Sequence, residues 1–154
     1  MIGIKEKSGR PERIFICSPL RPRSKDPGEA EKEIEANLNR ARKACKFVSD
    51  LGAIPYAPHI YATQFLDDGV PEERERGMEL GREWLRMADE VWVFSERISE
   101  GMASEIALAS KLDIPVRMVA EPNGLMRRII DDHSEMNVMS EGKERKDRKE
   151  RRRR

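Results

Sequence analysis

Short apolar runs alternate along this chain with longer stretches of helical periodicity. Four of these apolar runs have the length that is typical of buried strands. They cover residues 13–17, 53–57, 91–94 and 116–119. The first three are each followed by a stretch in which apolar residues recur every three or four positions, as on the buried face of a helix. This alternation predicts an α/β fold with a parallel sheet of about four strands and helices on both faces.

The predicted helices carry start and stop signals. The first spans residues 29–51 and stops at Gly52, since glycine commonly ends a helix. The second begins at Pro71, because proline is favoured in the first helical turn, and runs to about residue 88. The third follows Ser99, a residue type that caps helix N-termini. A last short helix is predicted over residues 125–130.

The length of 154 residues suffices for one domain with its own core. Residues 1–12 are polar and are predicted to form a flexible leader. Residues 13–132 are predicted to form the single α/β domain, and residues 133–154 a charged basic tail. No apolar run approaches the ~20 residues that span a membrane, and the N-terminus lacks the apolar stretch of a secretory signal. These features predict a cytoplasmic protein with no membrane association.

The net charge of +1 conceals an asymmetry between the tail and the rest of the chain. Residues 143–154 contain nine Lys or Arg and three Asp or Glu, a net charge of +6, whereas the remaining 142 residues carry a net charge of −5. Such a tail could bind nucleic acid through counterion release. Charge runs are more often simply solvated, and no aromatic residue is interleaved here, so nucleic acid stays the weaker alternative as a partner.

The few cysteines and histidines indicate no metal or redox chemistry. Cys17 and Cys45 each lie in an apolar element, which predicts free, buried thiols. The two histidines are far apart and form no ligand motif. The first strand is not followed by a glycine-rich phosphate loop of the P-loop or dinucleotide-binding type. We therefore expect no cofactor and no metal.

Residues 89–112 concentrate the candidate chemistry. A predicted buried strand leads into a polar turn with Ser99 and Gly101 and then into a helix that bears Glu105. Free backbone N–H groups and the helix dipole favour anion binding at such a turn. The dipole is expected to keep Glu105 ionised, so that the carboxylate could act as a nucleophile or base. The same pattern is also ordinary helix capping, and local sequence does not decide between the two interpretations.

The pattern Ser99-x-Gly101-x-x-x-Glu105, behind a strand that opens at Asp89, resembles the nucleoside 2-deoxyribosyltransferase superfamily, which includes the deoxynucleoside 5'-monophosphate N-glycosidases. The similarity is closer to a branch of small phage and bacterial proteins. Features shared with that branch are Ser18-Pro19, Pro58-His59 and a block containing Asp89, Ser99, Gly101, Met102 and Glu105. The resemblance covers roughly residues 13–120. It implies a flavodoxin-like, Rossmannoid three-layer sandwich with strand order 2-1-3-4.

The resemblance also implies a reaction and a site. Glu105 would attack the anomeric carbon of a 2-deoxyribosyl group, displacing the base and leaving a covalent ester that water or a second base resolves. The 5'-phosphate of a monophosphate would be held by Ser18 and by the turn that contains Ser99, Gly101 and Met102. Asp89 is placed with the catalytic residues, in a capping or orienting role. Substrates are then nucleosides or nucleoside 5'-monophosphates.

Residues from other strand exits should join this site, because parallel strands end at one edge of a sheet. Arg21, in the loop after the first strand, could pair with a phosphate or be a solvated loop charge. His59, after the second strand, is expected to be exposed and could hydrogen-bond a ligand. The sequence therefore predicts a cleft that combines hydroxyl groups, arginines, one histidine and a carboxylate.

One departure from the superfamily leaves two functions open. Enzymes of this type carry a carboxylate on the second helix near the base, and Gly81 falls at that place. The chain is thus either an N-glycosidase or deoxyribosyltransferase-like enzyme, or a non-catalytic nucleotide-binding module of the same fold. The resemblance further implies a homodimer or higher homo-oligomer. Gly77 and Gly81, one turn apart, would suit close packing against a neighbouring element or a second subunit.

Overall fold

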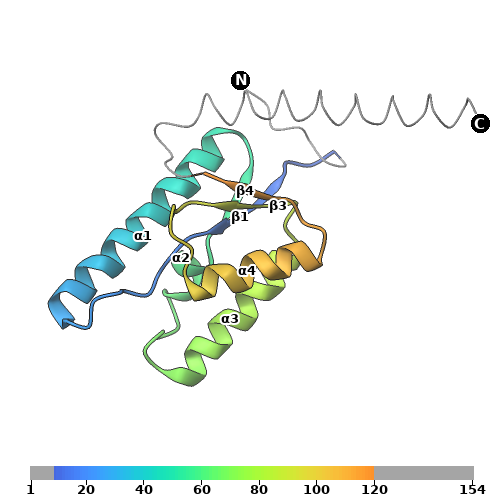
Figure 1. Ribbon diagram of the computed structural model, residues 1–154. Helices are drawn as coiled ribbons and strands as arrows, with labels where there is room; N and C mark the ends of the chain where they lie inside the picture. Colours follow the sequence, from blue (N-terminus) through green and yellow to red (C-terminus); the bar gives the residue numbers. More distant parts are fainter. Residues whose placement is uncertain (1–8, 120–154) are drawn as a thin grey trace, which may run out of the picture. The chain divides into compact units, whose positions relative to one another are not determined.

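The computed structural model describes residues 9–119, which form a parallel four-stranded sheet with the order β2-β1-β3-β4 (Figure 1). The strands are β1 (Arg13–Cys17), β2 (Ile54–Tyr56), β3 (Glu90–Val93) and β4 (Val116–Met118). The α/β class and the strand order agree with the predictions from the sequence. The predicted domain boundary near residue 132, the short helix over 125–130 and the basic tail lie outside the described residues.

Four helices connect and cover the strands. They are α1 (Pro27–Asp50), α2 (Pro58–Ala62), α3 (Pro71–Arg86) and α4 (Glu100–Lys111). Gly52, directly after α1, has a φ of +84°, the left-handed conformation that favours glycine at a helix end. Helix α2, directly after β2, is not among the helices that the sequence predicted. Five residues are too few to display helical periodicity in a sequence, although Pro58 at the first position is compatible with a helix start.

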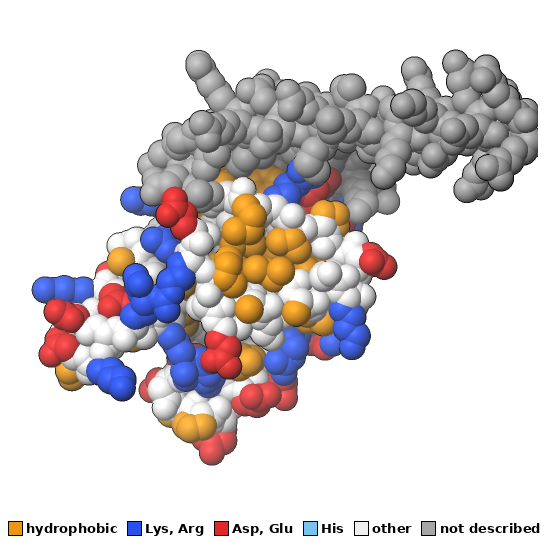
Figure 2. Space-filling model, in the orientation of Figure 1, with side chains coloured by type: hydrophobic (Ala, Val, Ile, Leu, Met, Phe, Trp, Pro, Cys, Tyr) orange, Lys and Arg blue, Asp and Glu red, His pale blue; other side chains and the backbone are white. Residues whose placement is uncertain are grey.

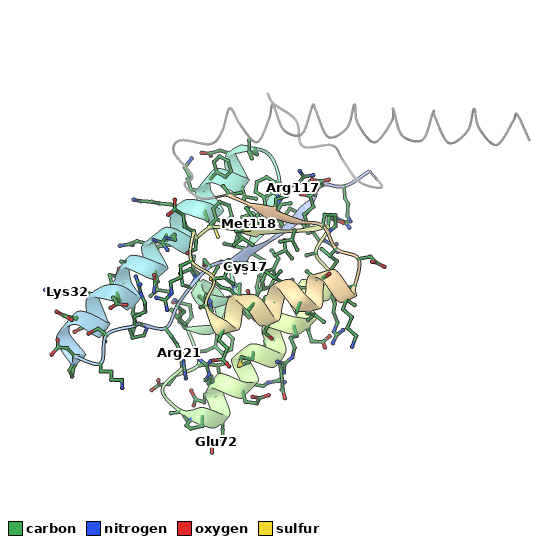
Figure 3. The ribbon with its side chains drawn as sticks, viewed as in Figure 1. Cys17, Arg21, Lys32, Glu72, Arg117 and Met118 are labelled. Carbon is green, nitrogen blue, oxygen red and sulfur yellow. The ribbon has the colours of Figure 1, made fainter. Side chains whose placement is uncertain are left out.

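The sheet buries side chains on both faces because successive strand residues point in opposite directions. On one face, Phe15 and Cys17 of β1 pack with Leu85 of α3 and Met102 of α4. On the other face, Phe47 of α1 contacts the rings of Trp92 and Phe94, with ring centroids 6.3 and 6.2 Å apart. The sheet is therefore a central layer between α1 and the α3–α4 pair, and Cys17, labelled in Figure 3, is the last residue of β1.

The outer surface carries many charges of both signs, which Figure 2 shows interspersed over the part of the molecule where α1 and α3 lie. Several form short-range ion pairs, such as Lys46 with Asp50 on α1 and Arg76 with Glu79 on α3. Exposed pairs of this kind contribute little to stability. No helix within residues 9–119 is long and apolar enough to span a lipid bilayer.

Asp89 stabilises the amino-terminal edge of the sheet. Its Oδ2 accepts hydrogen bonds from Arg10 Nη1 and from the backbone N–H of Arg13, both at 2.8 Å, and its Oδ1 accepts one from Arg10 Nη2 at 3.1 Å. Because Asp89 precedes β3, it lies one strand length from the edge where the chain enters α4. This placement corrects the expectation that Asp89 belongs to the catalytic residues: it ties β1 to β3.

Replacing Asp89 with alanine should reduce stability without changing ligand binding. The variant leaves the Arg13 N–H without its acceptor near a buried strand, which costs about 1–3 kcal/mol. Urea denaturation of parent and variant measures the loss. Asp50→Ala, which removes an exposed ion-pair partner, is the control and should change stability by less than about 0.5 kcal/mol. Equal effects of the two substitutions would contradict the assigned role of Asp89.

Candidate functional site

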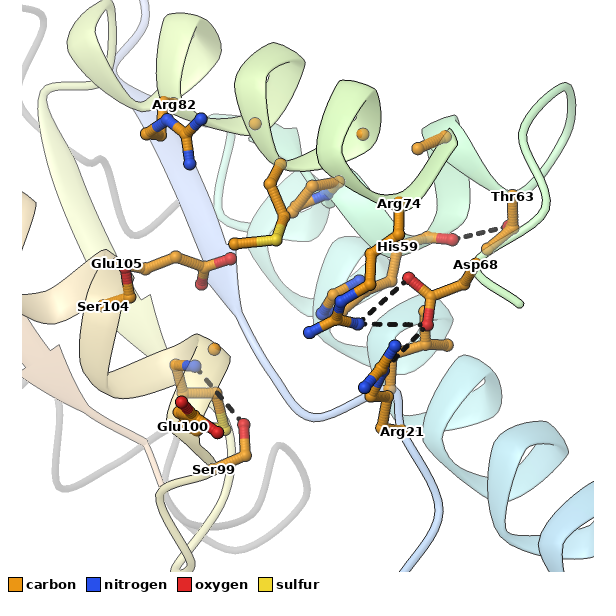
Figure 4. Close-up of a pocket in the computed structure, with 18 of the residues that line it drawn as sticks. Arg21, His59, Thr63, Asp68, Arg74, Arg82, Ser99, Glu100, Ser104 and Glu105 are labelled. Carbon is orange, nitrogen blue, oxygen red and sulfur yellow. Dashed lines mark hydrogen bonds and ion pairs between the residues drawn. The ribbon is translucent and has the colours of Figure 1, made fainter. Parts of the chain in front are cut away.

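A cavity of about 540 Å³ opens at the carboxyl-terminal edge of the sheet (Figure 4). Its walls come from the segments that follow β1, β2 and β3, together with α3 and α4. Six of the eight residues predicted to form the site line this cavity: Arg21, His59, Ser99, Gly101, Met102 and Glu105. Ser18 lies behind the lining, and Asp89 lies elsewhere. The convergence of strand exits that the sequence predicted is thus found in the structure.

Glu105 projects from the second turn of α4 into the cavity (Figure 4). Its Oε2 atom is buried and has no hydrogen-bond partner within residues 9–119. Burial raises the pKa of the carboxyl group to about 7, and the neighbouring Cys17 thiol, which donates to the carbonyl oxygen of Met102 at 3.9 Å, lowers this pKa in part. The expectation that the helix dipole keeps Glu105 ionised is therefore corrected. The dipole acts within the first turn, and desolvation outweighs it at this position.

Two neutral donors lie near the Glu105 carboxyl group. Burial and the charge of Glu105 raise the pKa of the Cys17 thiol well above its usual range. Burial, together with Tyr61 and Glu105, raises the pKa of the Tyr56 hydroxyl in the same way. Cys17 and Cys45 are both free cysteines, as the sequence predicted. The carboxyl group thus sits beside a thiol and a phenol that stay protonated at neutral pH.

The turn before α4 has the predicted capping geometry. Ser99 is the N-cap of α4, and its Oγ accepts a hydrogen bond from the Met102 N–H at 3.3 Å. No heavy atom lies within 4 Å of the place where a Cβ on Gly101 would project. The helix N-terminus therefore faces the cavity with its backbone accessible on the Gly101 side, an arrangement suited to an anionic group.

His59 and Ser18 together hold the first loop of the site. The ring Nε2 of His59 lies 2.9 Å from the carbonyl oxygen of Ser18. Burial lowers the pKa of the imidazole, and the hydrogen bond to Ser18 opposes this shift only in part. A neutral ring that donates Nε2–H to the carbonyl fits these facts. His59 is half-buried, not exposed as expected, because α2 turns it toward β1. The Ser18 hydroxyl is buried and lacks a partner among the described residues.

Arginines from three segments line the cavity: the loop after β1, helix α3 and the turn before α4. Arg21 Nε and Arg74 Nη1 both lie 3.2 Å from Oδ2 of Asp68, so two cations share one carboxylate (Figure 4). Further arginines of the lining are Arg23, Arg82 and Arg97. Sequence analysis found Arg21 but missed Arg74 and Arg82. In the sequence, these two arginines share a helix side with Gly77 and Gly81. That side is not apolar, so an analysis based on apolar periodicity does not identify it.

Gly77 and Gly81 are among the α3 residues that line the cavity. A Cβ on Gly77 would lie 3.6 Å from Leu66 Cδ1, and one on Gly81 would lie 3.7 Å from Pro58 Cβ, both ordinary contact distances. Packing against α2 and the loop after it therefore does not require glycine at either position. Each glycine nevertheless costs the helix about 1 kcal/mol relative to alanine. We expected these glycines to permit close packing against a neighbouring element or a second subunit. For the neighbouring element, α2 with the loop after it, this expectation is wrong.

The described part of the chain contains no group of three or more His, Cys, Asp or Glu residues that could hold a metal ion. The cavity lining includes the buried carboxyl group of Glu105, the N-terminus of α4 and several guanidinium groups, together with further acidic and hydroxyl side chains. This combination can bind an anionic molecule and present the Glu105 carboxylate to it as an oxygen nucleophile.

Comparisons with known proteins support the fold. The family described as "Domain of unknown function (DUF7768)" has a model that matches residues 12–119. Among solved structures, a 2-deoxyribosyltransferase from the psychrotolerant bacterium Bacillus psychrosaccharolyticus superposes with a TM-score of 0.54 and 22% sequence identity, over 73% of this chain and 74% of that one. At that identity the likeness concerns the fold. No curated protein sequence matches the chain.

The stability of the Glu105→Gln variant relative to the parent should increase as the pH rises. The folded-state pKa of about 7 exceeds the ordinary value of 4.5, so between these values the folded state binds more protons than the unfolded state. The stability of the parent therefore falls with rising pH through this window. Glutamine removes that loss, and the advantage of the variant should grow by up to about 3 kcal/mol between pH 4.5 and 8.5.

Urea denaturation of parent and variant at several pH values measures this difference. Glu83→Gln is the matched control, because it makes the same substitution at an exposed position on α3. A constant difference between Glu105→Gln and parent from pH 4.5 to 8.5 would show that the carboxyl group is not desolvated in the folded state.

Proposed function

We propose that this chain, which belongs to the DUF7768 family, cleaves the bond between base and sugar in a nucleoside or nucleoside 5'-monophosphate. The observation that carries the proposal is the Glu105 carboxyl group at the wall of a cavity of about 540 Å³, because its Oε2 atom is buried and has no hydrogen-bond partner among residues 9–119. That volume lies in the usual range for small-molecule sites. The fold shared with a 2-deoxyribosyltransferase supports the same class of chemistry.

The proposed reaction uses Glu105 as nucleophile. A carboxylate oxygen bonds to the anomeric carbon while the bond from that carbon to the base nitrogen breaks, and the bonding electron pair leaves with the base. The carboxylate first balances the positive charge of the oxocarbenium-like transition state and then forms a covalent ester. Attack by water on the anomeric carbon yields the free sugar, whereas attack by a second base yields a new nucleoside. Neither outcome requires a cofactor.

The other cavity residues would bind the substrate. A 5'-phosphate at the N-terminus of α4 would accept hydrogen bonds from the turn at Ser99, Gly101 and Met102. Arg21 would approach the same phosphate by exchanging its ion pair with Asp68 for one with the ligand. We assign His59 a positioning role, because its hydrogen bond to the Ser18 carbonyl orients the loop that carries the unpartnered Ser18 hydroxyl.

A second candidate function is a nucleotide-binding module without turnover. The observation that favours it is Gly81, which lines the cavity on α3 and offers no carboxyl group to protonate a departing base. The raised pKa of Glu105 adds to this case, since about half of the carboxyl groups would be protonated at neutral pH. The two candidates differ in whether a base is released.

Further expectations about partners and location stay predictions. These are a homo-oligomeric state, a cytoplasmic location and the weaker alternative of nucleic-acid binding through residues 143–154, which lie outside the described part of the chain.

The protein should release free base from at least one ribo- or 2'-deoxyribonucleoside or from its 5'-monophosphate. Chromatography of the reaction mixture measures the released base. Glu105→Ala and Glu105→Gln should reduce the rate by about 10³-fold or more, because the nucleophile is gone, while ligand binding detected by thermal shift persists. Glu96→Gln, an exposed glutamate outside the cavity lining, should behave as the parent. Ligand binding without any base release from the whole panel would instead support the nucleotide-binding module.

The rate of base release should rise with pH and level off above about 7. The attacking carboxyl group must be ionised, and the pKa of Glu105 in the free protein is about 7, so kcat/KM should follow its deprotonation. Cys17→Ala removes the neighbouring thiol that lowers this pKa, and the midpoint should therefore move to higher pH.

Rates measured from pH 5 to 9 test both statements. Cys45→Ala is the matched control, because Cys45 lies on α1 outside the cavity lining, and its profile should keep the midpoint of the parent. A parent rate that is constant across this range would exclude Glu105 as the titrating nucleophile.

A further inference from the structure

We infer that the ligand is a dinucleotide: the nucleotide beside Glu105 carries a second nucleoside on its 5'-phosphate, and this second nucleoside lies in a groove between α1 and the α2–α3 loop. The inference rests on the proposed function for the cavity that contains Glu105. It adds the class of substrate, a nucleoside 5'-phosphodiester, and the surface that recognises the added group.

A second hollow adjoins the cavity that contains Glu105. It is an open groove of about 1030 Å³, and seven of the residues that line it also line the cavity. The shared residues come from the loop after β1 and from the stretch between the end of α2 and the start of α3. Among them are Arg21 and Asp68, whose ion pair lies at the passage between the two hollows (Figure 4). A cavity of about 540 Å³ already suffices for a mononucleotide, so the groove is additional space.

Arg21 determines which end of the nucleotide faces the groove. In the proposed function its guanidinium group binds the 5'-phosphate at the N-terminus of α4. Because Arg21 lines both hollows, a phosphate that it binds lies at the passage between them. The sugar is then on the Glu105 side of this phosphate, and a group esterified to another of its oxygens projects into the groove.

The charges around the passage match a phosphodiester. Arg21 and Arg74 share the carboxylate of Asp68, both at 3.2 Å, which leaves one positive charge in excess, and a phosphodiester carries one negative charge. The groove beyond the passage is acidic. Asp67 and Glu73 add to the charge of Asp68 there, and the groove lining within residues 9–119 has a single cation, Arg21. A longer phosphate chain would be repelled, whereas an uncharged nucleoside would not.

The rest of the groove presents an apolar surface suited to a base. Phe65, in the loop after α2, lines the groove with 53% of its surface exposed. Ile34 and Leu38, one turn apart on α1, also line it, and Ile34 is 37% exposed. Exposed aromatic rings stack on bases without regard to sequence. A second base is therefore a planar, uncharged group that fits this surface.

The wall between the two hollows is held in place by α1. Asn37 donates a hydrogen bond from Nδ2 to the carbonyl oxygen of Leu20 at 3.0 Å. The carboxylate of Glu33 accepts hydrogen bonds from the backbone N–H groups of Arg23 and Ser24 at 2.7 and 3.1 Å. These contacts fix the loop after β1 without a ligand. A preformed groove reduces the entropy that binding costs.

Calorimetric binding tests the inference, with the full chain in a Glu105→Gln background that prevents turnover. The probes are the four homodinucleoside monophosphates and the four nucleoside 5'-monophosphates, each in the ribo and the 2'-deoxy form. For the base and sugar that bind most tightly, we expect the dinucleotide to bind at least tenfold more tightly than the monophosphate, because its second base contacts Phe65.

Two substitutions in the groove give an independent measurement. Phe65→Ala and Ile34→Ala change exposed side chains that line the groove and not the cavity. Each should weaken dinucleotide binding at least fivefold and leave monophosphate binding unchanged. Met87→Ala is the matched control, because Met87 is equally exposed and lines neither hollow. It should bind both ligands as the parent background does.

The inference is overturned if the monophosphate binds as tightly as the dinucleotide. It is also overturned if the two groove variants bind the dinucleotide as the parent background does, or if they weaken both ligands equally. A longer single strand of the preferred base identifies the source of the phosphodiester. Binding of the strand that depends on Phe65 indicates the end of a nucleic-acid strand, whereas binding of the dinucleotide alone indicates a free dinucleotide.

These outcomes separate the inference from the proposed function. Dinucleotide binding that depends on Phe65, without base release by the protein with Glu105 intact, would retain the groove and reject the glycosidase. Base release from a monophosphate that no dinucleotide inhibits would do the reverse.

Discussion

The parallel pairing of β1 with β3 at the centre of the sheet determines the geometry of the whole site. Cys17 lies opposite Val93 in this pair, so both strands end at the same level. The loop that starts at Ser18 and the turn that leads to Ser99 therefore leave the sheet side by side. At the other end of the pair, Asp89 accepts a hydrogen bond from the backbone of Arg13, which holds the two strands in this register. A slip of one residue would turn every side chain of β1 to the opposite face.

This pairing also explains how a carboxyl group can be kept out of water. Cys17 points to the face of the sheet that α3 and α4 cover. Glu105, on α4, lies close to the Cys17 side chain on that face. The free energy that desolvation costs is offset by the apolar core around it, to which Phe15, Leu85 and Met102 contribute. Active sites commonly tolerate such unfavourable groups because function depends on them.

Helix α3 shows a different kind of compromise. Its outer face is densely charged, and its inner face combines the buried Leu85 with two glycines that weaken the helix. Contacts with α2 and α4 hold it in place. Because α3 does not rely on its own helix propensity, it can leave backbone uncovered at the cavity and place Arg74 and Arg82 along the rim.

The sequence alone determined the elements and the direction of the chain through them. Apolar runs and capping residues such as Ser99 act locally, and the positions of strands and long helices follow from them within a few residues. The strand order and the proposal that Glu105 is the nucleophile both came from the resemblance, because local periodicity specifies neither the order of strands in a sheet nor the chemistry of a side chain. Helix α2 escaped detection because five residues carry too little periodicity.

Only the tertiary structure decided which residues share an environment. Asp89 is nearer in sequence to Ser99 than Arg74 or Gly77 is, yet Asp89 lies at the far edge of the sheet while the other two line the cavity. The protonation of Glu105 likewise depends on burial beside Cys17, 88 positions earlier in the sequence. Local pattern reports what each residue prefers, whereas burial and electrostatics arise from neighbours that only the folded chain brings together.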